Sequence, residues 1–284
     1  MSAKNRFIRT SRTSTNYIGA VLIILWCMFT VAAIAWIFAA SFSQTKEIFA
    51  NKLLASGLHF ENYAKVIAKH NILRYFGNSL FYTVLACAGV IFVAAPASYA
   101  ISKYRFPGKA LLQGLYSSSM GIPAVMLMIP LYMLAVQMKL TKNVLVLVLI
   151  YIFMAVPFTL FYLISFFSTI PKEIQESALV EGCTHIRAFW KVIFPLAQPG
   201  LVSVTIFNFI SVWNEYTWAL VFANSSARRT LSLGLQAIVD GMRYSGDWAA
   251  LFAAVVMVFL PTFILFIFLS EKIMGGITTG AVKG

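Results

Sequence analysis

Six long apolar stretches are the feature that most limits what this chain can fold into. About 20 helical residues, at a rise of about 1.5 Å each, cross the hydrocarbon core of a bilayer. The whole sequence is 60% hydrophobic and 11% charged, whereas about a quarter of the residues are charged in soluble domains. We therefore expect an all-α membrane protein with six transmembrane helices, at residues 17–42, 74–102, 110–136, 143–168, 198–222 and 248–270.

The segment before the first span, residues 1–16, carries four basic residues and no acid: Lys4, Arg6, Arg9 and Arg12. The positive-inside rule puts this N-terminal tail in the cytoplasm. A signal peptide would have a similar basic leader, but the length of the apolar stretch favours a retained helix. Six crossings return the C-terminal tail, residues 271–284, to the cytoplasm. Residues 43–73 and 223–247 are then expected outside the cytoplasm.

No segment has the pattern of an ATP-binding phosphate loop, a zinc-hydrolase helix or a nucleophile elbow. We therefore expect no enzyme activity, no metal and no cofactor in this chain. The net charge of +13 comes from scattered basic residues, so anionic membrane lipid is the expected counter-charge and nucleic acid is not. Glu215 is the one acid clearly inside a predicted span, which gives little support to ion coupling. The alternative is an ion-coupled carrier or channel working without an ATPase.

The segment between the fourth and fifth spans, residues 169–197, is too polar to cross and too regular for a loose linker. Pro171 is typical of the first turn of a helix, and acids suit the N-terminal half that follows. At 100° per residue, Ile174 and Ala178 share one face while Glu176 points away. The first short helix is therefore predicted to be amphipathic, with Glu176 on its polar side.

A second short helix is predicted beyond Gly182, which permits a sharp backbone turn. Thr184 can cap it, and apolar residues then recur at helical spacing until Pro195, which is expected to end it. The recurring residues are Ile186, Phe189, Trp190 and Ile193. The pair forms an elbow that packs on the membrane domain with one face and offers the other to a partner.

The run E-S-A-L-V-E-G at residues 176–182, followed by V-I-F-P-L, resembles the EAA loop of binding-protein-dependent importer permeases. The sequence departs mildly from that pattern at Ser177, where alanine is usual, and at Glu181, where aspartate is common. The resemblance implies the type I ABC importer permease (MetI-like) fold, and a loop that docks in a cleft of a cytoplasmic ATPase. The alternative is an ordinary amphipathic interfacial helix. The residues implied in ATPase coupling are Glu176, Ser177, Ala178, Glu181, Gly182 and Pro195.

The C-terminal run G-I-T-T-G-A-V-K-G, residues 276–284, is similar to the tail of maltose-type permeases. Residues 60–63 and the turn at 104–109 extend the likeness over nearly the whole chain. The family resemblance implies that the tail reaches between two ATPase subunits; by itself the tail would be a frayed terminus. The tail residues so implied are Thr279, Gly280, Ala281, Val282, Lys283 and Gly284.

The same resemblance implies a set of partners and a substrate class. The partners are a second homologous permease, two ATPase subunits that hold ATP and magnesium, and an extracytoplasmic solute-binding protein in a bacterial or archaeal cytoplasmic membrane. The substrate is a carbohydrate. Mono-, oligo- and acidic saccharides and glycerol phosphate all remain open.

A polar run lies in the fifth predicted span, at Trp213, Asn214, Glu215 and Tyr216. Aromatic faces stack on sugar C–H surfaces, and amides and carboxylates bind hydroxyl groups, so these residue types suit a carbohydrate pathway. Asn214 and Glu215 could equally hold helices together or line a gate. The run is our predicted substrate pathway, with both readings open.

Overall fold

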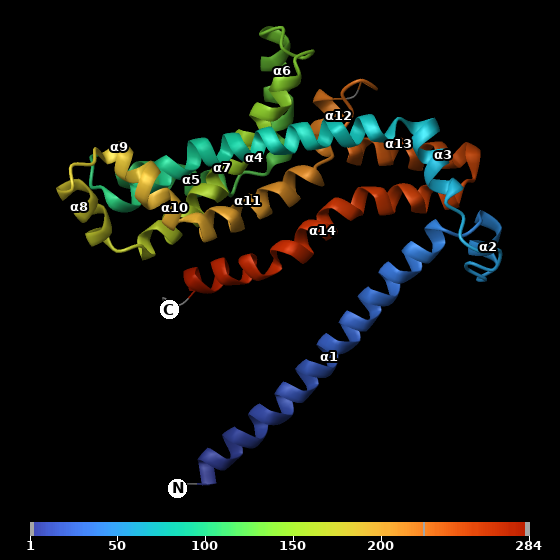
Figure 1. Cartoon of the computed structure of the whole chain (residues 1–284), viewed down its shortest axis with the longest axis horizontal. Coiled ribbons are helices and arrows are strands. Elements are labelled where there is room, and N and C mark those ends of the chain that lie inside the picture. The colour runs from blue at the N-terminus through green and yellow to red at the C-terminus, as the bar shows by residue number, and fades with distance from the viewer. Residues whose placement is uncertain (1–2, 224, 282–284) are drawn as a thin grey trace. The chain divides into compact units, whose positions relative to one another are not determined.

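The computed structural model describes residues 3–223 and 225–281, and every regular element among them is a helix (Figure 1). The chain forms two compact units. The first comprises Met1–His70 with Ile238–Met257, and the second comprises Asn71–Ala237 with Val258–Gly284. Two helices, α13 (Leu231–Ser245) and α14 (Trp248–Ala281), contribute to both units.

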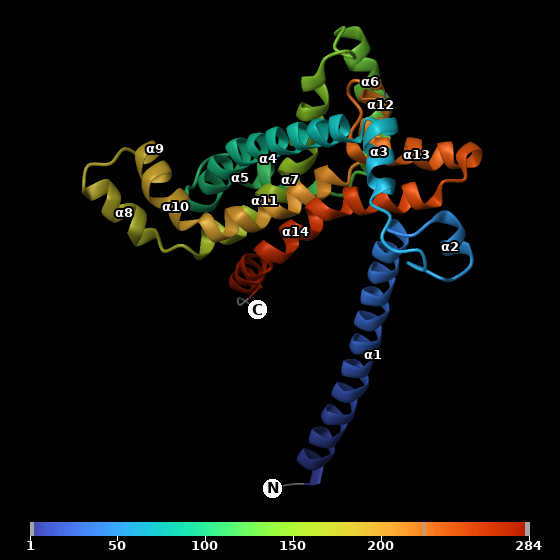
Figure 2. The same cartoon turned by 45° about the vertical axis from the view of Figure 1, so that its right-hand side comes forward.

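The first unit begins with α1 (Ala3–Ser41), which Figures 1 and 2 show as one long continuous helix. The backbone is helical from Ala3, so the helix of the first span also includes residues 3–16 of the predicted tail. The apolar part, Tyr17–Ser41, is long enough to cross a membrane, and most of its side chains are exposed, although Ala40 and Ser41 at its end are buried. The exposed side chains are therefore available to lipid or to another chain.

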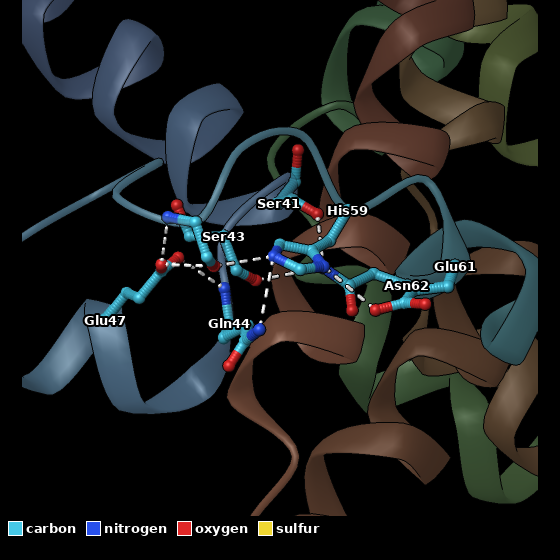
Figure 3. A network of polar contacts seen from close by, with 8 residues as sticks. Ser41, Ser43, Gln44, Glu47, His59, Glu61 and Asn62 are labelled. Carbon is cyan, nitrogen blue, oxygen red and sulfur yellow. Dashed lines mark hydrogen bonds and ion pairs between the residues drawn. The ribbon is translucent and has the colours of Figure 1, made fainter.

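The segment after α1 contains α2 (Thr45–Phe49) and α3 (Glu61–His70). A network of polar side chains holds this segment together (Figure 3). The buried Asn62 amide donates to the Ser41 carbonyl oxygen at 3.0 Å. The Glu47 carboxylate accepts from the Ser56 hydroxyl at 2.5 Å and from its amide at 2.7 Å, and His59 lies 2.8 Å from the same hydroxyl. The Ser56 hydroxyl, with the backbone donors, holds the pKa of Glu47 below its usual value. Side-chain bonds thus fix a segment that has little apolar core.

The second unit is built on α4 (Ile72–Lys103) packed along α7 (Val144–Thr169), with α11 (Gln198–Trp213) against both. Asn143 caps α7 by accepting a hydrogen bond from the Leu145 amide at 2.9 Å. Gly200 permits the close approach of α11 to α7, because a Cβ there would lie 2.5 Å from the Phe166 ring. Small residues at helix contacts are the usual means of close packing in membranes.

Four helical segments are long and apolar enough to span a membrane: Tyr17–Ser41, Ile72–Lys103, Val144–Thr169 and Trp248–Phe268. The third predicted span, 110–136, is instead α5 (Lys109–Ser119) followed by η1 (Ala124–Leu127) and α6 (Met128–Gln137), with a bend of 97°. Pro123 is extended, with ψ 122°, and proline disfavours helical geometry in the residue before it. The break therefore falls at residues 120–123.

The fifth predicted span, 198–222, is also interrupted. It consists of α11 and α12 (Thr217–Phe222), separated by residues 214–216. A second bent pair joins His185–Leu196 to α11 at 75°, so the described chain contains up to six spans if each bent pair counts as one. The sixth predicted span lies within α14, whose helix continues to Ala281 through most of the predicted tail.

Candidate functional site

The first arm of the elbow, which we define as residues 172–196, is α8 (Lys172–Val180). Ala178 is 6% exposed and faces the core, whereas Glu176 and Ser177 are exposed. The helix is amphipathic as predicted, and the Ala178 side chain is on the buried face with Ile174; its part in ATPase coupling stays a prediction. Val180, which was not among the predicted residues, is 89% exposed on this helix.

The turn of the elbow is a Schellman motif around Gly182. The Cys183 amide donates to the Ala178 carbonyl oxygen and the Gly182 amide to that of Leu179, both at 3.0 Å. Gly182 has φ +86°, a conformation that glycine adopts without the penalty of a side chain. Thr184 then caps the second arm by accepting from the Arg187 amide at 3.3 Å. The turn and the cap are as the sequence predicted.

The second arm consists of α9 (His185–Ala188), the π-helix η2 (Phe189–Ile193) and α10 (Phe194–Leu196). Phe189 and Ile193 are buried, but Ile186 is 73% exposed, so the predicted apolar face only partly faces the core. The helical run ends at Leu196, one residue after Pro195, and bends by 75° into α11, so the second arm ends at the proline as predicted. Figures 1 and 2 both show α8 and α9 projecting beyond the end of the α4 and α7 pair.

A cavity of about 540 Å³ lies between α7, α11, α12 and the broken third span. Glu215 is on its wall, and three donors satisfy the carboxylate. The Tyr151 hydroxyl donates to it at 2.8 Å, the Trp218 amide at 2.7 Å and the Ala219 amide at 3.1 Å. Glu215 therefore caps α12 and joins it to α7, as well as facing the cavity.

The other residues of the predicted pathway have different environments. Trp213 is 1% exposed, donates to the Val258 carbonyl oxygen at 3.2 Å and stacks on Phe209 at 5.5 Å. It packs in the core, and its part in a substrate pathway stays a prediction. Asn214 is exposed and donates to the carbonyl oxygen one turn before it, and neither it nor Tyr216 lines the cavity.

Sequence reasoning missed several polar residues of the cavity wall: Tyr151, Asn208, Ser211 and Thr217. Asn208 is buried and donates to the Thr159 hydroxyl at 3.0 Å. The signal was present, since Asn208, Ser211 and Glu215 recur at helical spacing and so share one face of the chain leading to the break. Tyr151 comes from another helix and had no local signal.

Within residues 3–223 and 225–281, no group of three or more His, Cys, Asp or Glu side chains could hold a metal. Of the predicted tail residues, Thr279, Gly280 and Ala281 end the α14 backbone helix. Val282, Lys283 and Gly284 lie outside the described residues. The tail contact therefore stays a prediction.

Comparisons with known proteins agree on one family. A family profile described as the binding-protein-dependent transport system inner membrane component matches residues 90–270. A diacetylchitobiose uptake system permease protein of Streptomyces coelicolor is 31% identical over 98% of this chain and 93% of its own. A trehalose transport system permease protein of Mycobacterium tuberculosis is 30% identical over 93% of this chain and 97% of its own.

Among solved structures, a bacterial ABC transporter involved in the import of the acidic polysaccharide alginate has a chain of the same fold. The TM-score is 0.80 at 24% sequence identity, over 95% of this chain and 98% of that one. The likeness includes nearly the entire length of both chains.

Proposed function

The chain belongs to the family of binding-protein-dependent transport system inner membrane components, and from that premise we propose that it is a permease subunit forming half of the translocation pathway of a carbohydrate importer. With its apolar helices it is a multi-pass membrane protein, and its family consists of transport components, not enzymes. The carbohydrate class is supported by relatives named for diacetylchitobiose and trehalose uptake.

The observation that carries the proposal is the geometry of the elbow. One face of α8 is anchored in the core through Ile174 and Ala178, while Glu176, Ser177 and Val180 remain exposed on the other. A rigid helix with a free acid suits a cleft of a basic partner. We therefore assign the elbow to the docking of an ATPase, which in this proposal holds the ATP and magnesium.

The complete transporter in this proposal contains a second homologous permease, two ATPase subunits and an extracytoplasmic solute-binding protein. It lies in the cytoplasmic membrane of a bacterium or archaeon, with both termini of this chain in the cytoplasm. Residues 279–284 are proposed to reach between the ATPase subunits. Nucleotide binding shifts the population of states, because the ATPase pair binds it more tightly when closed.

The cavity beside Glu215 is our candidate section of the carbohydrate pathway. It combines polar groups from Glu215, Asn208 and Ser211 with the rings of Phe158 and Phe207, the mixture that sugars require. The three hydrogen bonds to Glu215 give this carboxylate a role in holding α7 and α12 together, so the acid does not by itself support the rival ion-coupled carrier.

Reconstitution tests the proposal. The purified chain alone in liposomes is expected to give no sugar flux, with or without a proton or sodium gradient. Liposomes with the second permease, the ATPase and the binding protein should take up radiolabelled sugar only with internal ATP. Gradient-driven flux through the chain alone would show an ion-coupled carrier and refute the proposal.

A further inference from the structure

The turn that follows α4, residues 104–109, was marked in the sequence only by its resemblance to importer permeases. In the structure Tyr104 ends α4 in an extended conformation, and its amide donates to the Ala100 carbonyl oxygen at 3.0 Å. Its ring lies edge-on to the rings of Tyr99 and His185, with 5.7 Å between the ring centroids in each pair. The end of α4 therefore contacts the second arm of the elbow directly.

The Tyr104 hydroxyl bonds to both arms of the elbow. The Gln175 amide on α8 donates to it at 2.8 Å, and His185 Nδ1 on α9 lies 3.0 Å away. Gln175 is buried, so its donor needs this partner. A phenol has one proton, so while it accepts from Gln175 it can donate to His185 Nδ1, or to the Tyr99 hydroxyl, which lies farther away at 3.4 Å.

Two further contacts fix the same corner. The Lys103 ammonium donates to the Ile170 carbonyl oxygen at the end of α7. The centroid of the Tyr99 ring lies 5.0 Å from that of the Phe189 ring in η2. These contacts join residues more than 60 positions apart in sequence, so they connect α4 to a loop that does not adjoin it along the chain.

We propose that Tyr104 is a positioning residue that makes the elbow and the end of α4 move as one body. The chain connects the elbow covalently only to α7 and α11. Through Tyr104, a displacement of either arm at Gly182 is transmitted to α4 as well, which forms the centre of the second unit. This inference rests on the proposed function, because it assumes that the elbow receives the movement of an ATPase.

The test is Tyr104→Phe, which removes the hydroxyl and keeps the ring. The matched control is Tyr162→Phe, because the Tyr162 hydroxyl is buried without a hydrogen-bond partner in the described part of the chain. Hydrogen exchange of the full chain in detergent requires no partner and no substrate. Amide protection in residues 172–193 should fall about tenfold in Tyr104→Phe, the effect of losing one or two hydrogen bonds, and stay unchanged in the control.

The second readout is the number of ATP molecules hydrolysed per sugar imported by the reconstituted transporter. This ratio should rise about threefold or more in Tyr104→Phe, because the hydrogen bonds between Tyr104 and the elbow are lost. Gln175→Leu, which removes the donor to the same hydroxyl, should reproduce most of the rise. If amide protection falls but the ratio of ATP hydrolysed to sugar imported stays unchanged, the bond is only structural and the proposal is wrong. Unchanged amide protection in Tyr104→Phe would also refute it. If the unmodified transporter imports no sugar, the proposed function fails. The connection between Tyr104 and the elbow is still tested separately, by the amide protection of the chain alone.

Discussion

The elbow and the break at residues 214–216 each present a glutamate that the sequence singled out, and the structure treats the two acids in opposite ways. Glu176 is exposed, and its carboxylate has no hydrogen-bond partner among the described residues. Glu215 is half-buried and accepts from Tyr151 and from two backbone amides. The first acid is free for another protein, whereas the second holds its own segment together.

The difference teaches how to interpret a polar residue in an apolar chain. Leaving a buried donor without a partner costs about 1–3 kcal/mol, so an internal acid with three donors is first a structural element. Replacing an exposed acid changes the stability of the chain very little, so its loss is expected to affect only the binding of a partner. The following predictions are ordered by their expected effect on the stability of the chain.

Glu215→Leu should have the largest effect. It leaves the Tyr151 hydroxyl and two amides without an acceptor, at about 1–3 kcal/mol each. We expect a thermal midpoint in detergent lower by about 10 °C or more, together with loss of uptake. Glu215→Gln keeps one carbonyl acceptor and should lose less than half as much. An unchanged midpoint with lost uptake would make Glu215 a pathway residue first and a cap second.

Tyr151→Phe removes one donor to the same charged acceptor and should cost about 1.5–3 kcal/mol. Uptake should fall less than in Glu215→Leu, because the two amides still hold the carboxylate. The thermal midpoint measures the effect, with Tyr162→Phe as the control for the loss of an unpaired hydroxyl. Equal midpoints for the two variants would mean that the Tyr151 bond does not stabilise the break.

Gly182→Val places a β-branched residue at φ +86° in the turn of the elbow and should cost about 1–2 kcal/mol. Because the strain falls between the two arms, uptake should decrease more than tenfold while the membrane helices stay folded. Gly182→Asn is the control, since asparagine tolerates the left-handed region. Similar uptake in the two variants would show that this backbone conformation does not matter for coupling.

Glu176→Lys should have the smallest effect on stability, within about 0.5 kcal/mol, because the side chain is exposed. The ATPase recovered with the tagged chain should nevertheless fall about tenfold, since the charge facing a basic cleft is reversed. Glu173→Lys makes the same change of charge on the same helix, outside the predicted contact set. If both variants retain the ATPase equally, the elbow acid is not the docking residue.

The elbow shows how far local sequence signals reach. The spacing of Ile174, Ala178 and Glu176 predicted one buried and one exposed face, and Gly182 predicted the turn, because each depends on residues within about one helical turn. The sequence reading assigned Ala178 to both faces at once, and the structure places its side chain on the buried face.

By itself, the sequence determined that this chain spans a membrane, that it is helical and that an elbow separates two of its spans. Those properties follow from apolar length and from helical periodicity, which are local. Only the tertiary structure decided the use of each polar side chain, because Tyr151 meets Glu215 and Tyr104 meets Gln175 across 64 and 71 residues. A donor at that distance leaves no trace in the local pattern, yet it determines whether an acid is free for a partner or already bound.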